Sequence, residues 1–287
     1  GHRENARWGP FFQGDIGDRK LLDKVLEEQT IDAVMHFAAF AYVGESVADP
    51  RKYYRNNVHS TITLLDAVCD HHIEAFIFSS SCATYGLPER VPIDETHPRA
   101  PISPYGKSKY MVEEILCDYA AAYPLRFMSL RYFNAAGADP EGEIGEKHDP
   151  ETHLIPLVLD VAKGKSTRIS VFGDDYETPD GSCIRDYIHV SDLARAHVQA
   201  LEKLLEGSRS EFVNLGIGRG YSVFEVIDTA ARVTGREINH QVVARRPGDP
   251  AKLVASNEKA RKLLGWKPEY VELPDIVRTA WNWHKRI

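Results

Sequence analysis

Residues 75–81 have the sequence AFIFSSS, in which four consecutive apolar residues lead into three serines. Successive side chains of a strand point to opposite faces of a sheet, so this stretch predicts a strand that is buried on both faces. Strands of that kind are typical of parallel sheets, whose two faces are covered by helices. The stretch therefore indicates an α/β fold, with the serines at the carboxyl end of a strand.

The flanking sequence supports this interpretation. Apolar residues recur at helical spacing in residues 53–70, and a long helix is predicted for residues 104–123. Further strands are predicted at residues 11–16, 31–39 and 126–132. Because strands alternate with helices, we expect a parallel sheet that is covered by helices on both sides.

The composition of the sequence and the length of its predicted elements change after Asn134. Residues 135–152 are rich in glycine, proline and charge, as expected for a long functional loop, and the elements beyond them are shorter and more mixed. We therefore predict one domain over residues 1–134 and a second over residues 135–287. Residues 186–205 are expected to pack back on the first domain.

The composition excludes several classes of protein. Of the 287 residues, 43% are hydrophobic and 27% are charged, which is ordinary for a globular protein. The net charge of −7 argues against a broad nucleic-acid surface. The sequence has no apolar run long enough to cross a bilayer, and its polar start does not resemble a signal peptide. The four dispersed cysteines suit reduced thiols, so a cytoplasmic location is expected.

Two further patterns are interpreted as structural. His148 and His153 flank acidic residues, but their spacing matches no familiar metal motif, so no metal site is predicted. Residues 216–220 (GIGRG) contain only part of a dinucleotide-binding pattern. They are expected to form a tight turn into a helix that starts near Ser222.

The strongest chemical signal is the pair Tyr105 and Lys109. Residues four apart on a helix share one face, and a nearby ammonium favours the phenolate form of a tyrosine. Such a pair can take a proton from an alcohol. Y-x-x-x-K also occurs by chance on amphipathic helices, where it is only a surface pair. Here it follows Pro104 and lies downstream of the serines that end a strand, which favours the catalytic interpretation.

The residues that carry a family resemblance run through nearly the whole chain in the right order. The segments are GDI (14–16), HFAA (36–39), YRNNV (54–58), FSSSCATYG (78–86), SPYGKSK (103–109), LRYFN (130–134), FGDDY (172–176), DG (180–181), RDYIHV (185–190), NLG (214–216) and RRPGD (245–249). They resemble the extended short-chain dehydrogenase/reductase family and, within it, the UDP-glucose (UDP-galactose) 4-epimerases. The resemblance implies a Rossmann-type doubly wound parallel sheet that binds NAD, with a smaller mixed α/β domain for the UDP-sugar.

The resemblance also implies roles for individual residues. Tyr105 is expected to be the base, Lys109 its partner on the nicotinamide ribose, and Ser81 the hydroxyl that bridges substrate and tyrosine. The implied cofactor contacts are Asp15, Ile16, Phe37, Ala38, Ala39, Asn56, Ser79, Tyr105, Lys109 and Phe133. The implied substrate contacts are Ser81, Tyr105, Asn134, His153, Leu154, Ile169, Val171, Phe172, Arg185, Tyr187, Arg246, Asp249 and Leu253. The two arginines suit a pyrophosphate on physical grounds, because guanidinium groups are planar, bidentate donors.

The implied reaction is the NAD-dependent interconversion of UDP-galactose and UDP-glucose by oxidation at C4, rotation of the 4-keto sugar and re-reduction. UDP-pentoses or N-acetylated UDP-sugars remain alternatives, since Leu253 at the sugar ring is intermediate in size. A non-catalytic relative that binds UDP-sugars is a further alternative. A dehydratase is disfavoured, because Ser81 is followed by Cys82 and Ala83 rather than by Asp and Glu.

Two other features bear on the resemblance. Ala41 stands where family members often have a lysine. No glycine-rich turn between two strands precedes Phe11, although the family begins with such a unit of about 30 residues. We therefore expect the sequence to be part of a longer protein. The family also suggests a homodimer that pairs helices within residues 57–70 and 105–119.

Overall fold

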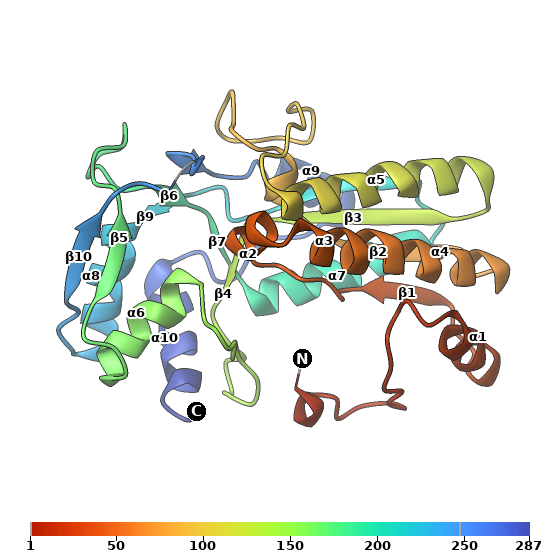
Figure 1. Cartoon of the computed structure of the whole chain (residues 1–287), viewed down its shortest axis with the longest axis horizontal. Helices are drawn as coiled ribbons and strands as arrows, with labels where there is room; N and C mark the ends of the chain where they lie inside the picture. The colour runs from red at the N-terminus through yellow and green to blue at the C-terminus, as the bar shows by residue number, and fades with distance from the viewer. Residues whose placement is uncertain (1, 247) are drawn as a thin grey trace. The chain divides into compact units, whose positions relative to one another are not determined.

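The computed structural model describes residues 2–246 and 248–287. Helices and strands alternate along the chain (Figure 1). The α-helices are α1 (Arg19–Glu28), α2 (Val43–Ala48), α3 (Pro50–Tyr53), α4 (Ser60–Asp70), α5 (Pro104–Ala122), α6 (Leu154–Lys163), α7 (Val190–Leu205), α8 (Val223–Thr234), α9 (Glu258–Leu264) and α10 (Leu273–His284). The strands are β1 (Ala33–His36), β2 (Ala75–Ser81), β3 (Arg126–Tyr132), β4 (Asn134–Ala136), β5 (Ile169–Phe172), β6 (Ile184–Arg185), β7 (Tyr187–His189), β8 (Glu211–Leu215), β9 (Tyr221–Ser222), β10 (His240–Val243) and β11 (Lys252–Leu253).

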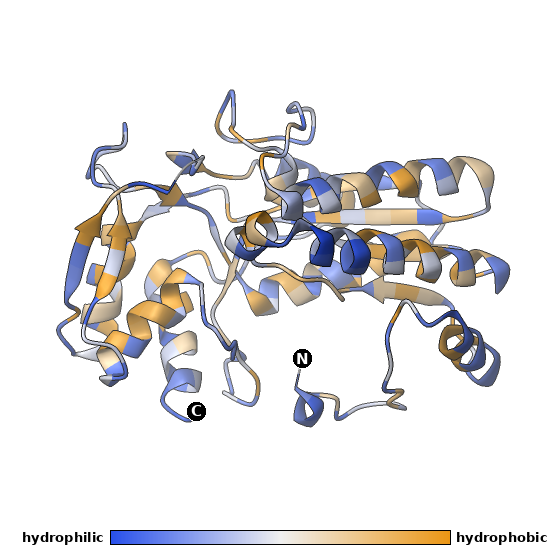
Figure 2. Ribbon diagram, in the orientation of Figure 1, coloured by the Kyte–Doolittle hydropathy of each residue, from blue (hydrophilic) through white to orange (hydrophobic). Residues whose placement is uncertain are grey.

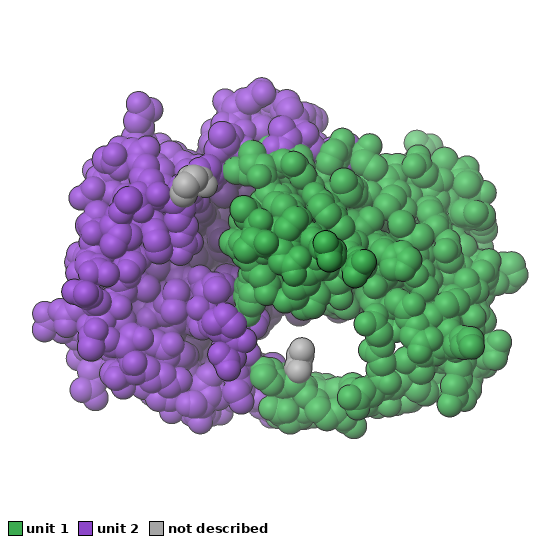
Figure 3. Space-filling view, viewed as in Figure 1, with its two compact units in different colours: residues 1–86, 101–130, 200–212 green, residues 87–100, 131–199, 213–287 purple. Residues whose placement is uncertain are grey.

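The chain forms two compact units that interleave in sequence (Figure 3). Unit 1 contains residues 1–86, 101–130 and 200–212, and unit 2 contains residues 87–100, 131–199 and 213–287. The units do not follow the expected boundary near Asn134, because β3, α7 and β8 each begin in one unit and end in the other. The division by role into residues 1–134 and 135–287 stays a prediction.

Unit 1 is built around β2, the strand that the sequence predicts at residues 75–81. The sheet has the order β1-β2-β3-β8, and β1 pairs with β2 in parallel, with Ala33 opposite Ala75 and His36 opposite Phe78. All seven residues of β2 are buried, as the sequence predicts. Apolar residues of α4 and α5, such as Leu65 and Leu116, pack with β2 in one core. The α/β fold with a parallel sheet is therefore confirmed.

Several predicted elements differ from the observed ones. Residues 11–16 form no strand, because no strand among the described residues pairs with them. The strand expected at residues 31–39 is the shorter β1, and residues 37–42 form a loop. The helix expected at residues 53–70 is continuous from α3 through a π-helical turn, Tyr54–His59, into α4. The predicted turn at residues 216–220 is confirmed, and Ser222 caps α8.

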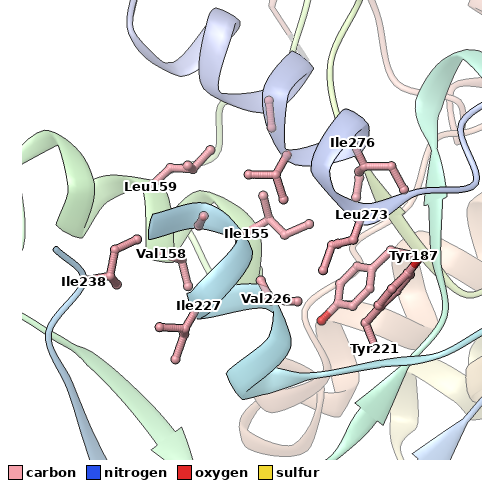
Figure 4. Close-up of a cluster of buried hydrophobic side chains, with 14 of the residues drawn as sticks. Ile155, Val158, Leu159, Tyr187, Tyr221, Val226, Ile227, Ile238, Leu273 and Ile276 are labelled. Atoms are coloured by element: carbon pink, nitrogen blue, oxygen red, sulfur yellow. The ribbon is translucent and has the colours of Figure 1, made fainter. Parts of the chain in front are cut away.

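Unit 2 has a separate apolar core (Figure 4). Residues of α6, α8 and α10, including Val158, Val226 and Ile276, pack there with side chains of β5. Figure 2 shows that α6 is largely hydrophobic along its length. The strands form three small groups, β10-β5, β11-β6-β9 and β4-β7. In these pairings, residues 169–172 lie opposite 240–243 and residues 184–185 lie opposite 252–253. Residues 187–189 lie opposite 134–136. Within the described ranges, no helix is long and apolar enough to cross a membrane.

Candidate active site

Helix α5 presents the predicted catalytic pair. The hydroxyl of Ser103 accepts a 3.1 Å hydrogen bond from the Gly106 amide and so caps the helix, and Pro104 occupies its first turn. These two residues define where α5 begins, so Tyr105 lies in its first turn and Lys109 lies one turn further along. Tyr105 is half-buried, whereas only 4% of Lys109 is exposed. The pair is therefore not the solvated surface pair that was its main alternative.

The ammonium of Lys109 is held in a closed environment. Its Nζ donates a 2.7 Å hydrogen bond to the Ser79 carbonyl oxygen and lies 4.9 Å from the centre of the Phe78 ring. Burial lowers the pKa of Lys109 to about 8, and the nearby charge of Glu113 opposes this shift. At neutral pH the ammonium form therefore still predominates, so Lys109 can supply a positive charge one helical turn from Tyr105.

A close backbone approach brings the Ser81 segment to the start of α5. A Cβ atom on Gly106 would lie 2.4 Å from the Ala83 carbonyl oxygen, so only glycine fits there. Ser81 ends β2, is 7% exposed, and accepts a 3.2 Å hydrogen bond from the Ala83 amide through its hydroxyl oxygen. The turn after β2 and the first turn of α5 are thus packed backbone to backbone, which places Ser81 near Tyr105.

Sequence reasoning did not single out Glu113, which lies one turn beyond Lys109 on α5. Its side chain is fully buried, and one carboxylate oxygen accepts 2.8 Å hydrogen bonds from the hydroxyls of Ser80 and Ser129. The residue connects α5 to both β2 and β3. The spacing of Tyr105, Lys109 and Glu113 at intervals of four is the signal that could have found it, since residues four apart share a helix face.

The loop after β1 is fastened to α5 by Asn57, another residue that the sequence analysis passed over. Its side chain accepts from the Phe40 amide and donates to the Phe40 carbonyl oxygen, both at 2.9 Å, and it also donates to the Ser108 hydroxyl at 3.1 Å. The loop so held carries Phe37 and Ala38, which are exposed, and Ala39, which is half-buried. All three are predicted cofactor contacts, and their loop is open to a ligand.

Unit 1 also contains an open hollow of about 770 Å³. Its lining includes Asp15 and Asn56, which are predicted cofactor contacts, and the exposed cation of Arg55. The volume is within the usual range for small-molecule and cofactor sites, and the guanidinium suits an anionic group. These residues therefore fit a dinucleotide. Ile16 is half-buried beside Asp15, Ser79 is buried at the end of β2, and Phe133 belongs to unit 2.

Unit 2 brings several of the predicted substrate contacts together. The guanidinium of Arg185 forms an ion pair with Asp249 and is 12% exposed. Leu253 lies directly opposite Arg185, because β11 and β6 pair in parallel. The guanidinium of Arg246 lies 3.8 Å from the centre of the Phe172 ring. Asp249 thus holds the guanidinium of Arg185, and the Phe172 ring holds that of Arg246. Two positioned guanidinium groups suit the two negative charges of a diphosphate.

Other predicted substrate contacts are part of the unit 2 core. The side chains of Ile169, Val171 and Tyr187 are buried there, and Leu154 packs against them. Along β5 these residues alternate with Ser170 and Phe172, which are half-buried on the opposite face. Of the predicted contacts on this strand, Phe172 is therefore on the face that Ser170 shares and that is not in the core, while Ile169 and Val171 hold the strand in place.

Asn134 is positioned by Asp186, which the sequence analysis quoted only as part of a motif. The Asn134 amide donates a 3.0 Å hydrogen bond to the Asp186 carbonyl oxygen. The Asp186 carboxylate is buried and accepts from the amides of Ile217, Gly218 and Ala255. Burial raises the pKa of this carboxyl to about 6, although the three amides oppose the shift. Asp186 therefore anchors the turn that leads from β8 to β9.

A buried hydroxyl in unit 2 also indicates a ligand. Tyr176 is 7% exposed, and its hydroxyl has no hydrogen-bond partner among the described residues. The guanidinium of Arg245 lies 4.1 Å from the centre of its ring. A buried polar group without a partner costs about 1–3 kcal/mol. A polar ligand group that reached this hydroxyl would recover that cost.

The predicted contact His153 lies in the loop before α6. Its Nδ1 faces the Glu146 carboxylate in a close ion pair, and this carboxylate raises the pKa of His153. Leu154 begins α6 directly after it. His153 is thus placed by its acidic neighbours in the same loop.

The chain is similar to known proteins in both sequence and structure. The NAD dependent epimerase/dehydratase family matches residues 1–216. The UDP-glucose 4-epimerase of Rhizobium leguminosarum bv. trifolii is 55% identical over 286 residues, which cover 100% of this chain and 87% of the relative. The structure of UDP-glucose 4-epimerase from Brucella ovis in complex with NAD is 54% identical, with a TM-score of 0.96 over 98% of this chain and 86% of that one.

A third relative was solved with both kinds of ligand. The UDP-glucose 4-epimerase from Bifidobacterium longum, in complex with NAD⁺ and UDP, is 42% identical, with a TM-score of 0.89 over 96% of this chain and 82% of that one. The similarity therefore extends over both units, and the family match covers all the predicted catalytic residues. On this evidence the chain belongs to the NAD-dependent epimerase/dehydratase family.

Proposed function

We propose that the protein is a UDP-glucose 4-epimerase that interconverts UDP-glucose and UDP-galactose. The observation that carries the proposal is the buried Lys109 ammonium one helical turn from Tyr105. A surface pair would have no need of such burial, whereas a proton-transfer pair requires it. The relatives named above, which are about half identical to this chain over nearly all of it, support the same function.

Tyr105 moves the proton in this mechanism. Its phenolic oxygen, as phenolate, accepts the proton of the sugar 4-hydroxyl, and returns it when the 4-keto sugar is reduced on its other face. Lys109 favours the phenolate, because a nearby positive charge stabilises a negative one in a closed environment. Ser81 donates a hydrogen bond to the reacting oxygen and keeps it within reach. NAD, when bound, supplies the acceptor and donor of hydride at C4.

The unit 2 residues hold the nucleotide in this proposal. Arg185 and Arg246 provide charged hydrogen bonds to the diphosphate, while Phe172 and Tyr176 offer an aromatic face and a buried hydroxyl. In this proposal, the charged groups bind the diphosphate and none of them binds the hexose. A firm hold on UDP with a weak hold on the sugar allows the sugar to turn over between the two hydride transfers.

Replacement of Tyr105 by Phe tests the assignment. Removal of a positioned general base typically costs about 10²–10⁴-fold in rate, so turnover of UDP-galactose should fall by that factor. UDP binding, measured by calorimetry, should stay within about twofold, because the hydroxyl does not contact the nucleotide in this mechanism. Unchanged turnover in the Tyr105→Phe variant would contradict the proposal.

The sugar range and the assembly are further parts of the proposal. Leu253, opposite Arg185, is assigned to the border of the sugar ring, where its intermediate size leaves room for an N-acetyl group. A Leu253→Tyr variant should therefore lose turnover of UDP-GlcNAc in preference to UDP-glucose; an unchanged ratio of the two rates argues against this role. We also infer a cytoplasmic location from the four dispersed cysteines, and a homodimer from the resemblance of the segments that form α4 and α5 to the family.

A further inference from the structure

Four side chains in the loop before α6 converge on one point. Glu146, His148, Glu151 and His153, here called the His–Glu cluster, each offer one ligand atom, and these four atoms lie within 4.8 Å of one another. The Nδ1 atom of His148 is 3.1 Å from the Glu146 carboxylate, and the Nδ1 atom of His153 faces the same oxygen. Both imidazoles also lie near Glu151, at 3.7 Å and 3.5 Å.

The cluster is held in place from outside. The Glu146 carbonyl oxygen accepts a 2.9 Å hydrogen bond from the indole nitrogen of Trp283 on α10. A Cβ atom on Gly145 would lie 2.3 Å from the ring of Trp283, so the chain can approach α10 this closely only at a glycine. One oxygen of Glu151 accepts from the amides of Thr152 and His153 at 2.7 Å and 2.8 Å. The backbone at Glu146 and the side chain of Glu151 are therefore held by contacts other than those with the two imidazoles.

The carboxylates of the cluster are more buried than its imidazoles. The side chains of Glu146 and Glu151 are 19% and 13% exposed, while those of His148 and His153 are 42% and 49% exposed. Two carboxylates are thus partly withdrawn from water, and two imidazoles cover them from the solvent side. A cation that enters between the imidazoles would meet both carboxylates.

The donor set decides which cation fits. Two imidazole nitrogens and two carboxylate oxygens suit Zn²⁺ and the other divalent first-row transition metals, whereas Mg²⁺ and Ca²⁺ prefer oxygen ligands alone. Four protein ligands complete the tetrahedral set of a structural Zn²⁺ site. The spacing of these residues in the sequence does not predict a metal site. The four ligand atoms come together only in the folded loop.

We propose that the His–Glu cluster binds one divalent transition-metal ion, of which Zn²⁺ is the best match. The ion would cross-link both ends of the segment 146–153 and so stiffen the chain that leads into α6. Both Nδ1 atoms would serve as ligands, in place of their present contact with Glu146. This inference does not depend on the proposed epimerase activity, because Tyr105, Lys109 and Ser81 are not members of the cluster and the cluster supplies no group to proton transfer. His153, which the family resemblance implies as a substrate contact, would be a metal ligand in this proposal.

Calorimetric titration of Zn²⁺ into the chelator-treated protein tests the proposal. One equivalent should bind, and a His148→Asn variant should lose at least about tenfold in affinity, since loss even of an outer-shell partner costs about 10–100-fold. Glu146→Gln should have a similar effect. His71→Asn is the matched control, because His71 also pairs with a carboxylate, that of Asp23 at 3.1 Å, outside the cluster. Its affinity for Zn²⁺ should equal that of the wild type.

A second measurement separates the cluster from the four cysteines, whose thiols could also bind zinc. Co²⁺ bound at the cluster should give visible absorption bands of a four-coordinate site without the charge-transfer band of a thiolate ligand. Circular dichroism should show that the variants remain folded. Failure to bind Zn²⁺ stoichiometrically would overturn the proposal. So would affinities that are the same in His148→Asn, Glu146→Gln and the wild type, or a thiolate band in the Co²⁺ spectrum.

Discussion

The Nζ atom of Lys109 donates a 2.7 Å hydrogen bond to the backbone carbonyl oxygen of Ser79. This bond joins the helix that carries Tyr105 to the end of the strand that carries Ser81. One turn further along α5, Glu113 accepts from the side chain of Ser80, the next residue of β2. Two consecutive turns of α5 are therefore tied to two consecutive residues of β2, and the predicted catalytic side chains are positioned by a helix and a strand rather than by loops.

Glu113 is expected to maintain the charge on Lys109. Its carboxylate is the group that opposes the effect of burial on the pKa of Lys109. In a Glu113→Gln variant the ammonium loses this partner, so it should deprotonate at a lower pH. The alkaline limb of the pH–rate profile should therefore move to lower pH.

Glu114→Gln is the matched control, since Glu114 is exposed on the next position of the same helix. Its profile should match that of the wild type. A Glu113→Gln variant that is less stable but keeps the wild-type pH profile would show that Glu113 is only structural.

Gly106 is expected to be required for the placement of Ser81. An alanine Cβ at this position would lie 2.4 Å from the Ala83 carbonyl oxygen and would push the turn after β2 away from α5. A displacement of about 1 Å in a catalytic group can cost about 10²-fold in rate. Gly106→Ala should therefore lower kcat for UDP-galactose by about that factor.

Gly44 provides the control for this substitution. It lies in α2, and a Cβ there would meet nothing within 4 Å. Gly44→Ala should leave kcat unchanged and should not lower the free energy of unfolding, since alanine favours a helix more than glycine does. Equal kcat values for the two alanine variants would refute the argument about close approach.

His36 should make unit 1 sensitive to acid. It is 4% exposed, and burial lowers its pKa to about 3, with a smaller contribution from the charge of Lys109. The unfolded chain, with a pKa near 6.5, therefore binds more protons than the folded one between about pH 3 and pH 6.5. The stability that His36 contributes is complete above pH 6.5 and is lost as the pH falls through that range.

A His36→Gln variant measures this effect. Glutamine does not titrate, and its amide can replace the imidazole in the 2.9 Å contact with the Thr61 hydroxyl. Between pH 6.5 and pH 5, the free energy of unfolding in urea should fall by up to about 2 kcal/mol more for the wild type than for the variant. Parallel pH dependences of the two proteins would mean that His36 is not held neutral in the fold.

Arg185 is expected to bind the diphosphate of UDP. A hydrogen bond to a charged group contributes about 1.5–3 kcal/mol, so Arg185→Met should weaken UDP binding by about 10- to 100-fold. Calorimetry with UDP alone measures this without any need for turnover. Arg236→Met is the control, because Arg236 is exposed after α8 and has no predicted contact with the nucleotide. The assignment fails if both variants bind UDP as the wild type does.

The sequence predicted those parts of the fold in which local patterns and tertiary packing agree. The buried strand at residues 75–81 and the long helix at residues 104–123 are both confirmed. The strand expected at residues 11–16 is wrong, because an alternating or apolar stretch forms a strand only when a neighbour completes its hydrogen bonds. Periodicity reports which face of an element is apolar, but it does not report whether a partner strand is there.

The candidate site shows the same division. The spacing of Tyr105 and Lys109 follows from the helical repeat, so it could be predicted from the sequence. Glu113 and Asn57 could not be identified in this way, because their hydrogen-bond partners are distant in the sequence. Ser129 is 16 positions from Glu113, and Ser108 is 51 positions from Asn57. The burial that lowers the pKa of Lys109, and the approach of Ala83 to Gly106, arise only when β2 and α5 pack together.

By itself, the sequence determined the α/β class and the family resemblance and predicted the catalytic pair, because each depends on residue type and on short spacings along one chain. The tertiary structure alone decided the charge environment of Lys109, the register that sets Leu253 against Arg185, and the convergence of the His–Glu cluster. These depend on distances between segments that are separate in sequence, and such distances are set by the packing of helices on strands and of loops on helices.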